Sequence, residues 1–123
     1  LTLDLDLSGL LRDLQAGSPP RRSQVPPDIA EVCRVATEAA AAALGTISAT
    51  LLTRTREEPW CLGRQVAMCC AFEHLRCTNQ MIARWFGVNH GTVMHARKVV
   101  ADRRKLESRV ARLVAAVEAS LVG

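Results

Sequence analysis

The side chains best suited to do chemistry lie within residues 79–98. A segment there that is predicted to be helical carries imidazole, hydroxyl, amide and cationic groups, which donate or accept hydrogen bonds. The positions predicted to face outward are Asn89, His90, Gly91, Thr92, His95, Arg97 and Lys98. A helix also begins with free backbone N–H groups and the positive end of its dipole. Such a helix start suits the edge of a base pair and the phosphate beside it.

Two short helices joined by a tight turn are predicted to position these groups. Thr78 is a suitable N-cap for the first helix, and Ala83 is small enough for the two helices to cross closely. Gly87 tolerates the positive φ at which the chain reverses. The apolar wedge between the helices is predicted to be Ile82, Phe86, Val88, Val93 and Ala96. This pattern is typical of a helix-turn-helix. The alternative is a helical hairpin in which Gly87 only ends a helix.

The composition predicts a single all-α domain, a small helical bundle with a modest core. The chain has 123 residues, of which 49% are apolar. It contains two Trp, two Phe and no Tyr, while Ala, Leu, Val and Arg are abundant. Such a composition favours packed helices over pleated sheet.

The net charge of +4 is modest, but it is unevenly distributed. Residues 1–53 contain four Arg against six acids, whereas residues 84–123 contain eight Arg or Lys against three acids. The positive field is therefore predicted on the half that carries the helix-turn-helix. Arg suits bidentate contacts to phosphate or guanine, although a GC-rich genome would also enrich it.

Three regions follow from the pattern along the chain. Residues 1–17 are expected to form an amphipathic leucine-rich segment, helical or extended, and residues 18–27 a Pro-rich linker. Residues 28–123 form the helical domain. The leucine stripe could cover the domain's own core, bind a protein partner or pair two copies of the chain. The residues expected to make that contact are Leu3, Leu7, Leu11 and Leu14.

Helices are expected at 28–44, 48–52, 62–75, 78–86, 89–105 and 108–121. Asp28 with Glu31 is predicted to cap the first, Gly45 to end it, and Ser48 to cap the short second one. Val99, Val100 and Leu106 are predicted to extend the apolar side of the fifth.

Residues 47–104 resemble the C-terminal DNA-binding domain of the bacterial replication initiator DnaA. Residues 49–56, Ala-Thr-Leu-Leu-Thr-Arg-Thr-Arg, resemble the family's short helix and basic loop, and 64–68, Arg-Gln-Val-Ala-Met, resemble the start of its next helix. Residues 86–96, Phe-Gly-Val-Asn-His-Gly-Thr-Val-Met-His-Ala, resemble its signature Phe-Gly-Gly-Arg-Asp-His-Thr-Thr-Val-x-His-Ala. The order and spacing agree over nearly half of the chain. The resemblance implies a Trp-repressor-like helical fold that reads short duplex boxes.

The resemblance also implies roles for individual residues. Arg56 would enter the minor groove beside Arg54 on the basic loop, and residues 89–92 would meet major-groove bases. The helix starts would hold phosphates through side chains and backbone N–H groups. The residues concerned there are Arg64, Gln65, Thr78, Asn79 and Gln80.

Several departures from the family pattern weaken the expectation that the chain reads the family's usual box. The turn is one residue shorter, Asn89 replaces Asp, and Gly91 replaces a Thr or Ser. Glu57 and Glu58 lie beside Arg56, where they should weaken the attraction of phosphate.

Other classes of function have little in the sequence to favour them. There is no Gly-rich phosphate loop, no recognisable catalytic frame and no apolar run long enough to span a membrane. His90 and His95 are interpreted as DNA-facing groups before acid–base catalysts. The five Cys include no Cys-x-x-Cys pair and are expected to be reduced core residues. The alternative is a zinc site to which Cys70, His74 and Cys77 contribute ligands. We expect no enzyme activity, cofactor or metal, and a cytoplasmic, nucleoid-associated location.

The sequence therefore predicts a stand-alone protein that binds double-stranded DNA as a regulator or accessory factor of replication or transcription. An origin in a phage or mobile element would fit such a protein. The alternative hypothesis is a protein-interaction module that keeps the helical fold and binds a replication or transcription protein.

Overall fold

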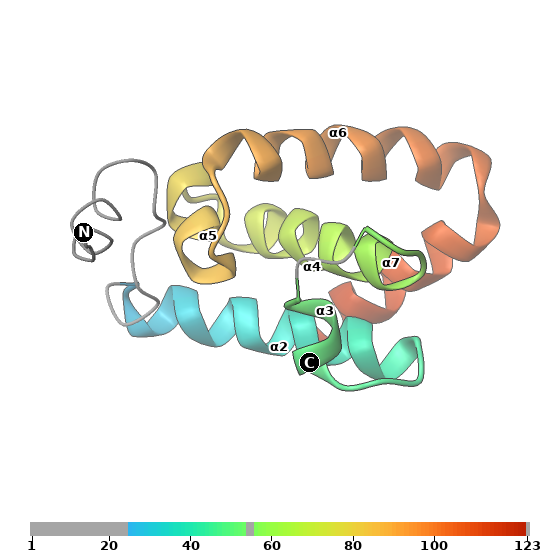
Figure 1. Cartoon of the computed structure of the whole chain (residues 1–123), viewed down its shortest axis with the longest axis horizontal. Coiled ribbons are helices and arrows are strands. Elements are labelled where there is room, and N and C mark those ends of the chain that lie inside the picture. Colours follow the sequence, from blue (N-terminus) through green and yellow to red (C-terminus); the bar gives the residue numbers. More distant parts are fainter. Residues whose placement is uncertain (1–24, 54–55, 123) are drawn as a thin grey trace, which may run out of the picture.

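The prediction of an all-α bundle is confirmed. The computed structural model describes residues 25–53 and 56–122, and all regular structure in those ranges is helical. The helices, shown in Figure 1, are α2 (Pro27–Ala43), α3 (Ser48–Leu51), α4 (Trp60–Leu75), α5 (Asn79–Phe86), α6 (His90–Leu106) and α7 (Ser108–Val122). The leucine stripe with Leu3, Leu7, Leu11 and Leu14 lies outside the described residues, and so does Arg54.

Helix α4 is the centre of the bundle. It lies between α6 and α2 (Figure 1) and contacts each of the other described helices. Its buried residues run without interruption through the middle of the helix, as Val66, Ala67, Met68, Cys69, Cys70 and Ala71. A helix that is apolar on all sides must be covered on all sides. The other helices therefore take their positions from α4.

Small side chains allow the surrounding helices to approach closely. On α2 the fully buried residues include Cys33, Ala36 and Ala40, and α7 contributes Val110 and Val117. The one buried polar side chain among the described residues is Thr37, whose hydroxyl donates a hydrogen bond of 2.8 Å to the carbonyl oxygen of Cys33. The bundle therefore combines a continuous apolar core with a locally satisfied hydroxyl.

The ends of the site-bearing helices follow local signals. The Thr78 hydroxyl accepts a hydrogen bond of 3.3 Å from the backbone N–H of Met81, so Thr78 is the N-cap of α5. Gly87 has φ of 73°, and the next N–H, that of Val88, donates to the carbonyl of Ala83 at 3.0 Å. These are the features of a helix end that requires a left-handed residue. Gly45, with φ of 77°, follows the end of α2 in the same way.

Three local predictions were wrong. Helix α2 begins at Pro27 and not after Asp28, and its N-cap Pro26 makes no side-chain capping bond. Ser48 is the first residue of α3 and makes no cap. Leu106, predicted to extend the apolar side of α6, is the last residue of that helix and is 85% exposed. Val25, within the predicted linker, is buried in the core.

Replacement of Gly87 by alanine is expected to lower the free energy of unfolding by about 1–2 kcal/mol, because a Cβ strains the left-handed backbone. A Cβ at this position would meet no atom within 4 Å, so the cost would come from the backbone and not from a clash. Chemical denaturation measures the change. Gly87→Asn is the matched control and should lose less, since asparagine tolerates this region better. An alanine variant as stable as the parent would contradict the requirement for glycine.

Candidate nucleic-acid interface

The first turn of α6 is exposed and locally capped. Asn89 is its N-cap, and the side-chain oxygen of Asn89 accepts a hydrogen bond of 3.0 Å from the backbone N–H of Thr92. Residues 89–92 are all exposed, whereas Val93 is fully buried. The amide oxygen of Asn89 is therefore used inside the helix start, and its amide nitrogen remains as the group that can face a ligand.

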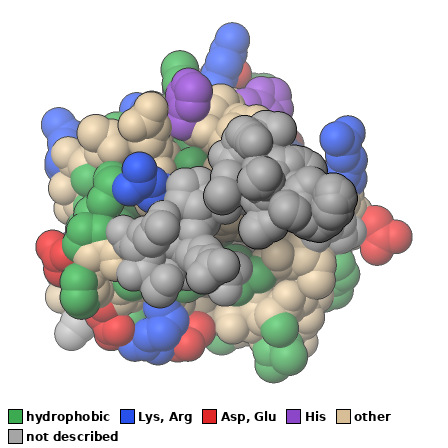
Figure 2. Space-filling view, turned by 60° about the vertical axis from the view of Figure 1, so that its left-hand side comes forward, with side chains coloured by type: hydrophobic (Ala, Val, Ile, Leu, Met, Phe, Trp, Pro, Cys, Tyr) green, Lys and Arg blue, Asp and Glu red, His purple; other side chains and the backbone are tan. Residues whose placement is uncertain are grey.

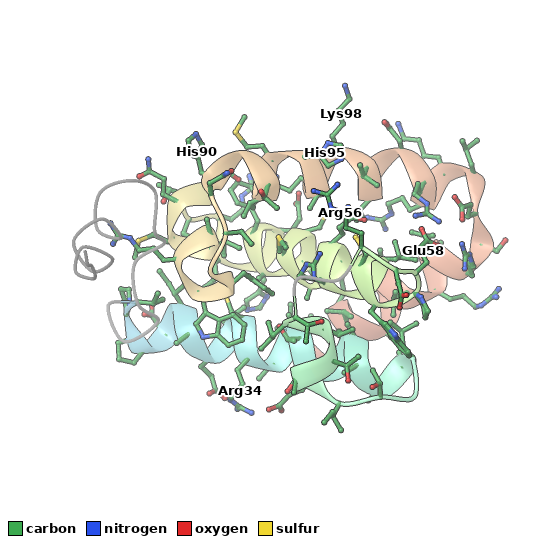
Figure 3. The ribbon with its side chains drawn as sticks, in the orientation of Figure 1. Arg34, Arg56, Glu58, His90, His95 and Lys98 are labelled. Atoms are coloured by element: carbon green, nitrogen blue, oxygen red, sulfur yellow. The ribbon has the colours of Figure 1, made fainter. Side chains whose placement is uncertain are left out.

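The outer side of α6 continues the polar surface. His95 and Lys98 are exposed, and Figure 3 shows Lys98 directed away from the body of the protein. Ala96 and Val100, between and beyond them, are buried against the bundle. The alternation means that one side of the helix is fixed by packing while the other is open along its first three turns.

A cleft of about 630 Å³ lies beside the start of α6. It is lined by residues of three separate segments, namely the loop before α4, the first turns of α4, and the turn with the start of α6. The polar side chains that line it are Thr53, Arg56, Arg64, Gln65, Thr92 and His95. Five of these six were predicted as site residues, from positions up to 39 residues apart, such as Arg56 and His95. The fold thus brings the predicted loop, helix start and outward helix face to one place.

Arg64 lines this cleft but also holds its wall. One guanidinium nitrogen of Arg64 donates to the carbonyl oxygens of Thr53 and of Leu51, the latter at 3.4 Å. These carbonyls lie at the end of α3 and just after it, so Arg64 fixes the start of the loop that carries Arg56. Arg64, which was predicted as a phosphate contact, therefore has a structural role in this fold.

Arg97 has a different place from the one predicted. Its guanidinium lies over the ring of Phe72, 3.6 Å from the ring centroid, and donates a hydrogen bond of 3.1 Å to the side-chain oxygen of Asn79. It is half-buried, and its Nε is buried without a partner. Arg97 thereby joins α6 to α4 and to the start of α5. Its cation is stacked and bonded within the protein, which gives Arg97 a structural role in place of the predicted phosphate contact.

The predicted phosphate site at the start of α5 lies outside the cleft lining. The hydroxyl of Thr78 caps the helix, the side-chain oxygen of Asn79 binds Arg97, and Gln80 is exposed. None of the three lines the cleft beside α6. The residues near Arg56 and those near Thr78 are therefore two separate parts of the predicted interface.

The acidic residue beside Arg56 is paired with arginines. The carboxylate of Glu58 binds the guanidinium of Arg103 at 2.7 Å and that of Arg109 at 3.2 Å. Glu107 binds the same two arginines, at 2.8 and 3.4 Å. The Arg103 hydrogen bond holds the pKa of the Glu58 carboxyl below its ordinary value. Sequence reasoning missed this network, and it removes much of the expected repulsion of phosphate by Glu58.

The surface around the α5 end of the molecule is shown in Figure 2. Histidine side chains and a cationic side chain lie at the upper edge of this face, where α6 runs, and most of the visible Asp and Glu side chains lie lower. On this face the acidic side chains therefore lie mainly away from the histidines.

Three of the five cysteines, Cys33, Cys69 and Cys70, are buried in the core as predicted, whereas Cys61 and Cys77 are partly exposed. Burial raises the pKa of the Cys33 and Cys70 thiols to about 12, so both are protonated at neutral pH. Within the described ranges no three His, Cys, Asp or Glu side chains are grouped closely enough to hold a metal ion.

Comparisons with known protein families, with curated proteins and with solved structures gave no match. Among the helices of residues 25–53 and 56–122, none is both long enough and apolar enough to cross a bilayer.

Replacement of Arg97 by lysine is expected to lower the free energy of unfolding by about 1 kcal/mol, although the charge is kept, because lysine cannot both stack on Phe72 and bind Asn79 in the same way. Thermal and chemical unfolding measure the change. Lys98→Arg on the exposed side of α6 is the control and should leave stability unchanged. Wild-type stability of the Arg97→Lys variant would contradict the structural role of Arg97.

Proposed function

We propose that this protein binds double-stranded DNA, with α5 and α6 acting as a helix-turn-helix and the start of α6 entering the major groove. His90, Thr92 and His95 would read base edges, and Arg56 would contact the adjacent backbone or minor groove. The observation that carries the proposal is the convergence of Arg56, Gln65, Thr92 and His95 on one cleft from three segments of the chain.

The start of α6 has the physical properties that this function needs. It combines the positive end of a helix dipole with exposed hydroxyl and imidazole groups, and no acidic residue lies in its first turn. Its inner side is fixed by Val93 and Ala96, which are buried. A recognition helix must be rigid to place its side chains against bases, so this packing supports the assignment.

The resemblance of residues 47–104 to the DnaA C-terminal domain supports the same proposal. In that pattern the basic loop, the helix start at Arg64 and the outward side of the last helix act together on one duplex, and here the corresponding residues line one cleft. By that likeness the protein would act as a regulator or accessory factor of replication or transcription.

The direct test is binding of the purified protein to random-sequence duplex DNA at increasing salt, followed by selection of the preferred site. A DNA-binding protein loses affinity as salt rises, in proportion to the phosphates that it contacts. The selected site also shows whether one or two copies bind, since two copies related by two-fold symmetry select a palindrome. No duplex binding at low salt would contradict the proposal and favour the protein-interaction module.

Replacement of Thr92 by alanine is expected to weaken binding to the selected site by about 1–3 kcal/mol, because a group that reads a base edge is lost. Binding to unrelated duplexes should change little, so the preference between sequences should flatten. Fluorescence anisotropy with both duplexes measures the two affinities. Thr50→Ala, on α3 and outside the cleft lining, is the control. An unchanged preference in the Thr92 variant would contradict base reading by this residue.

Replacement of Lys98 by alanine is expected to weaken binding to all duplexes alike and to reduce the slope of log affinity against log salt by about one unit, as expected for one lost phosphate contact. Lys98 is exposed on the open side of α6, directed away from the core (Figure 3). Lys105→Ala, near the far end of the same helix, is the matched control and should leave the slope unchanged. Equal slopes for the Lys98 variant and the wild type would remove Lys98 from the interface.

A further inference from the structure

The segment that carries Arg56 is fixed on both sides by arginines from other parts of the chain. Before it, Arg64 donates to the carbonyl oxygens of Leu51 and Thr53. After it, Glu58 binds Arg103 and Arg109. Arg56 therefore lies between two anchors that are set by α4 on one side and by the junction of α6 and α7 on the other.

The second anchor is a network of two arginines and two glutamates. Arg103 reaches both oxygens of Glu58, at 2.7 and 3.5 Å, and both oxygens of Glu107, at 2.8 and 3.0 Å. Its side chain is 23% exposed, which makes it the most buried member of the network. The planar guanidinium fork thus fixes direction as well as distance. Arg109 completes the network from the first turn of α7.

The network connects the loop to the proposed recognition helix. Arg103 lies in the last turn of α6, the same helix that begins at His90 and whose Thr92 and His95 line the cleft with Arg56. Figure 3 shows Arg56 and Glu58 on the loop beside α6, with Glu58 nearer the end of that helix. A loop tied to α6 keeps its position relative to the face that α6 presents.

A bidentate network of four charges can add to global stability, and it also ties the loop that carries Glu58 to α6. Local opening of a loop requires far less free energy than opening of the core. The ion pairs of Glu58 can therefore change the position of the loop. Loss of the Glu58 bonds is therefore expected to change the position of the loop that carries Arg56.

We propose that Glu58 is a positioning residue of the DNA interface, which holds the loop through Arg103 and Arg109 so that Arg56 stays on the rim of the cleft. This role rests on the proposed function. Glu58 then strengthens DNA binding, although its negative charge alone would repel phosphate.

The test is Glu58→Gln, measured by fluorescence anisotropy on the selected duplex at one fixed ionic strength. Glutamine has nearly the same shape but cannot form the charged bonds to Arg103 and Arg109. Charge alone predicts tighter binding, because one negative charge is removed near a polyanion. The positioning role predicts binding about fivefold weaker, as expected when one placed cation is no longer held. Asp102→Asn removes one negative charge from an exposed position on α6 and should bind at least as tightly as the wild type.

The same substitution in an Arg56→Ala background separates positioning from a general structural effect. If Glu58 acts through Arg56, Glu58→Gln has no weakening effect once Arg56 is absent, and the two changes are strongly non-additive. Equal weakening in both backgrounds would overturn the positioning role, and so would equal or tighter binding by the single variant while the wild type binds DNA. Failure of the wild type to bind any duplex would overturn the proposed function and this role together. Thermal unfolding of each variant confirms that it is folded.

Discussion

The burial of α4 is the constraint on which the placement of the site depends. Because its middle is apolar on every side, the other described helices cover it and take their positions from it. Its first turns bring Arg64 and Gln65 to the cleft, and its later turns place Phe72 beneath Arg97. One rigid element therefore fixes both the wall of the cleft and the flank of α6. Side chains that are far apart in sequence can face one ligand only because such an element is shared.

The arginines of this chain divide into those that build the surface and those that remain available to a ligand. Arg97 is stacked and bonded within the fold, and Arg103 is committed to two carboxylates. Arg64 donates hydrogen bonds to backbone carbonyl oxygens. The number of Arg and Lys residues in the basic half of the sequence is therefore larger than the number of cations that remain available to a ligand. The proposed binding of a duplex would therefore depend on a few placed cations and on the helix start more than on a broad basic patch.

Local sequence signals predicted the elements, and long-range contacts determined what the side chains do. Thr78, Gly87 and the buried side of α6 follow from the residues within one turn of each, and the structure agrees with them. The bonds of Arg97 to Asn79 and of Arg103 to Glu58 join residues 18 and 45 positions apart. No periodicity or spacing contains that information, because the pairing depends on how helices cross. The exposure of Leu106 has the same origin, since apolar character does not tell whether the last residue of a helix is covered.

The start of α6 links two departures of this chain from the DnaA pattern. A Cβ at Gly91 would lie 3.2 Å from the side-chain oxygen of Asn89, tighter than ordinary packing, and that oxygen caps the helix through Thr92. Any larger residue at 91 must shift the cap by a few tenths of an ångström, so glycine at 91 and asparagine at 89 are compatible with each other. In the proposed complex with DNA, the absence of a side chain at Gly91 would let the backbone of α6 approach a base pair more closely than in the usual pattern. His90 and Thr92, on either side of Gly91, would then determine which base pair fits.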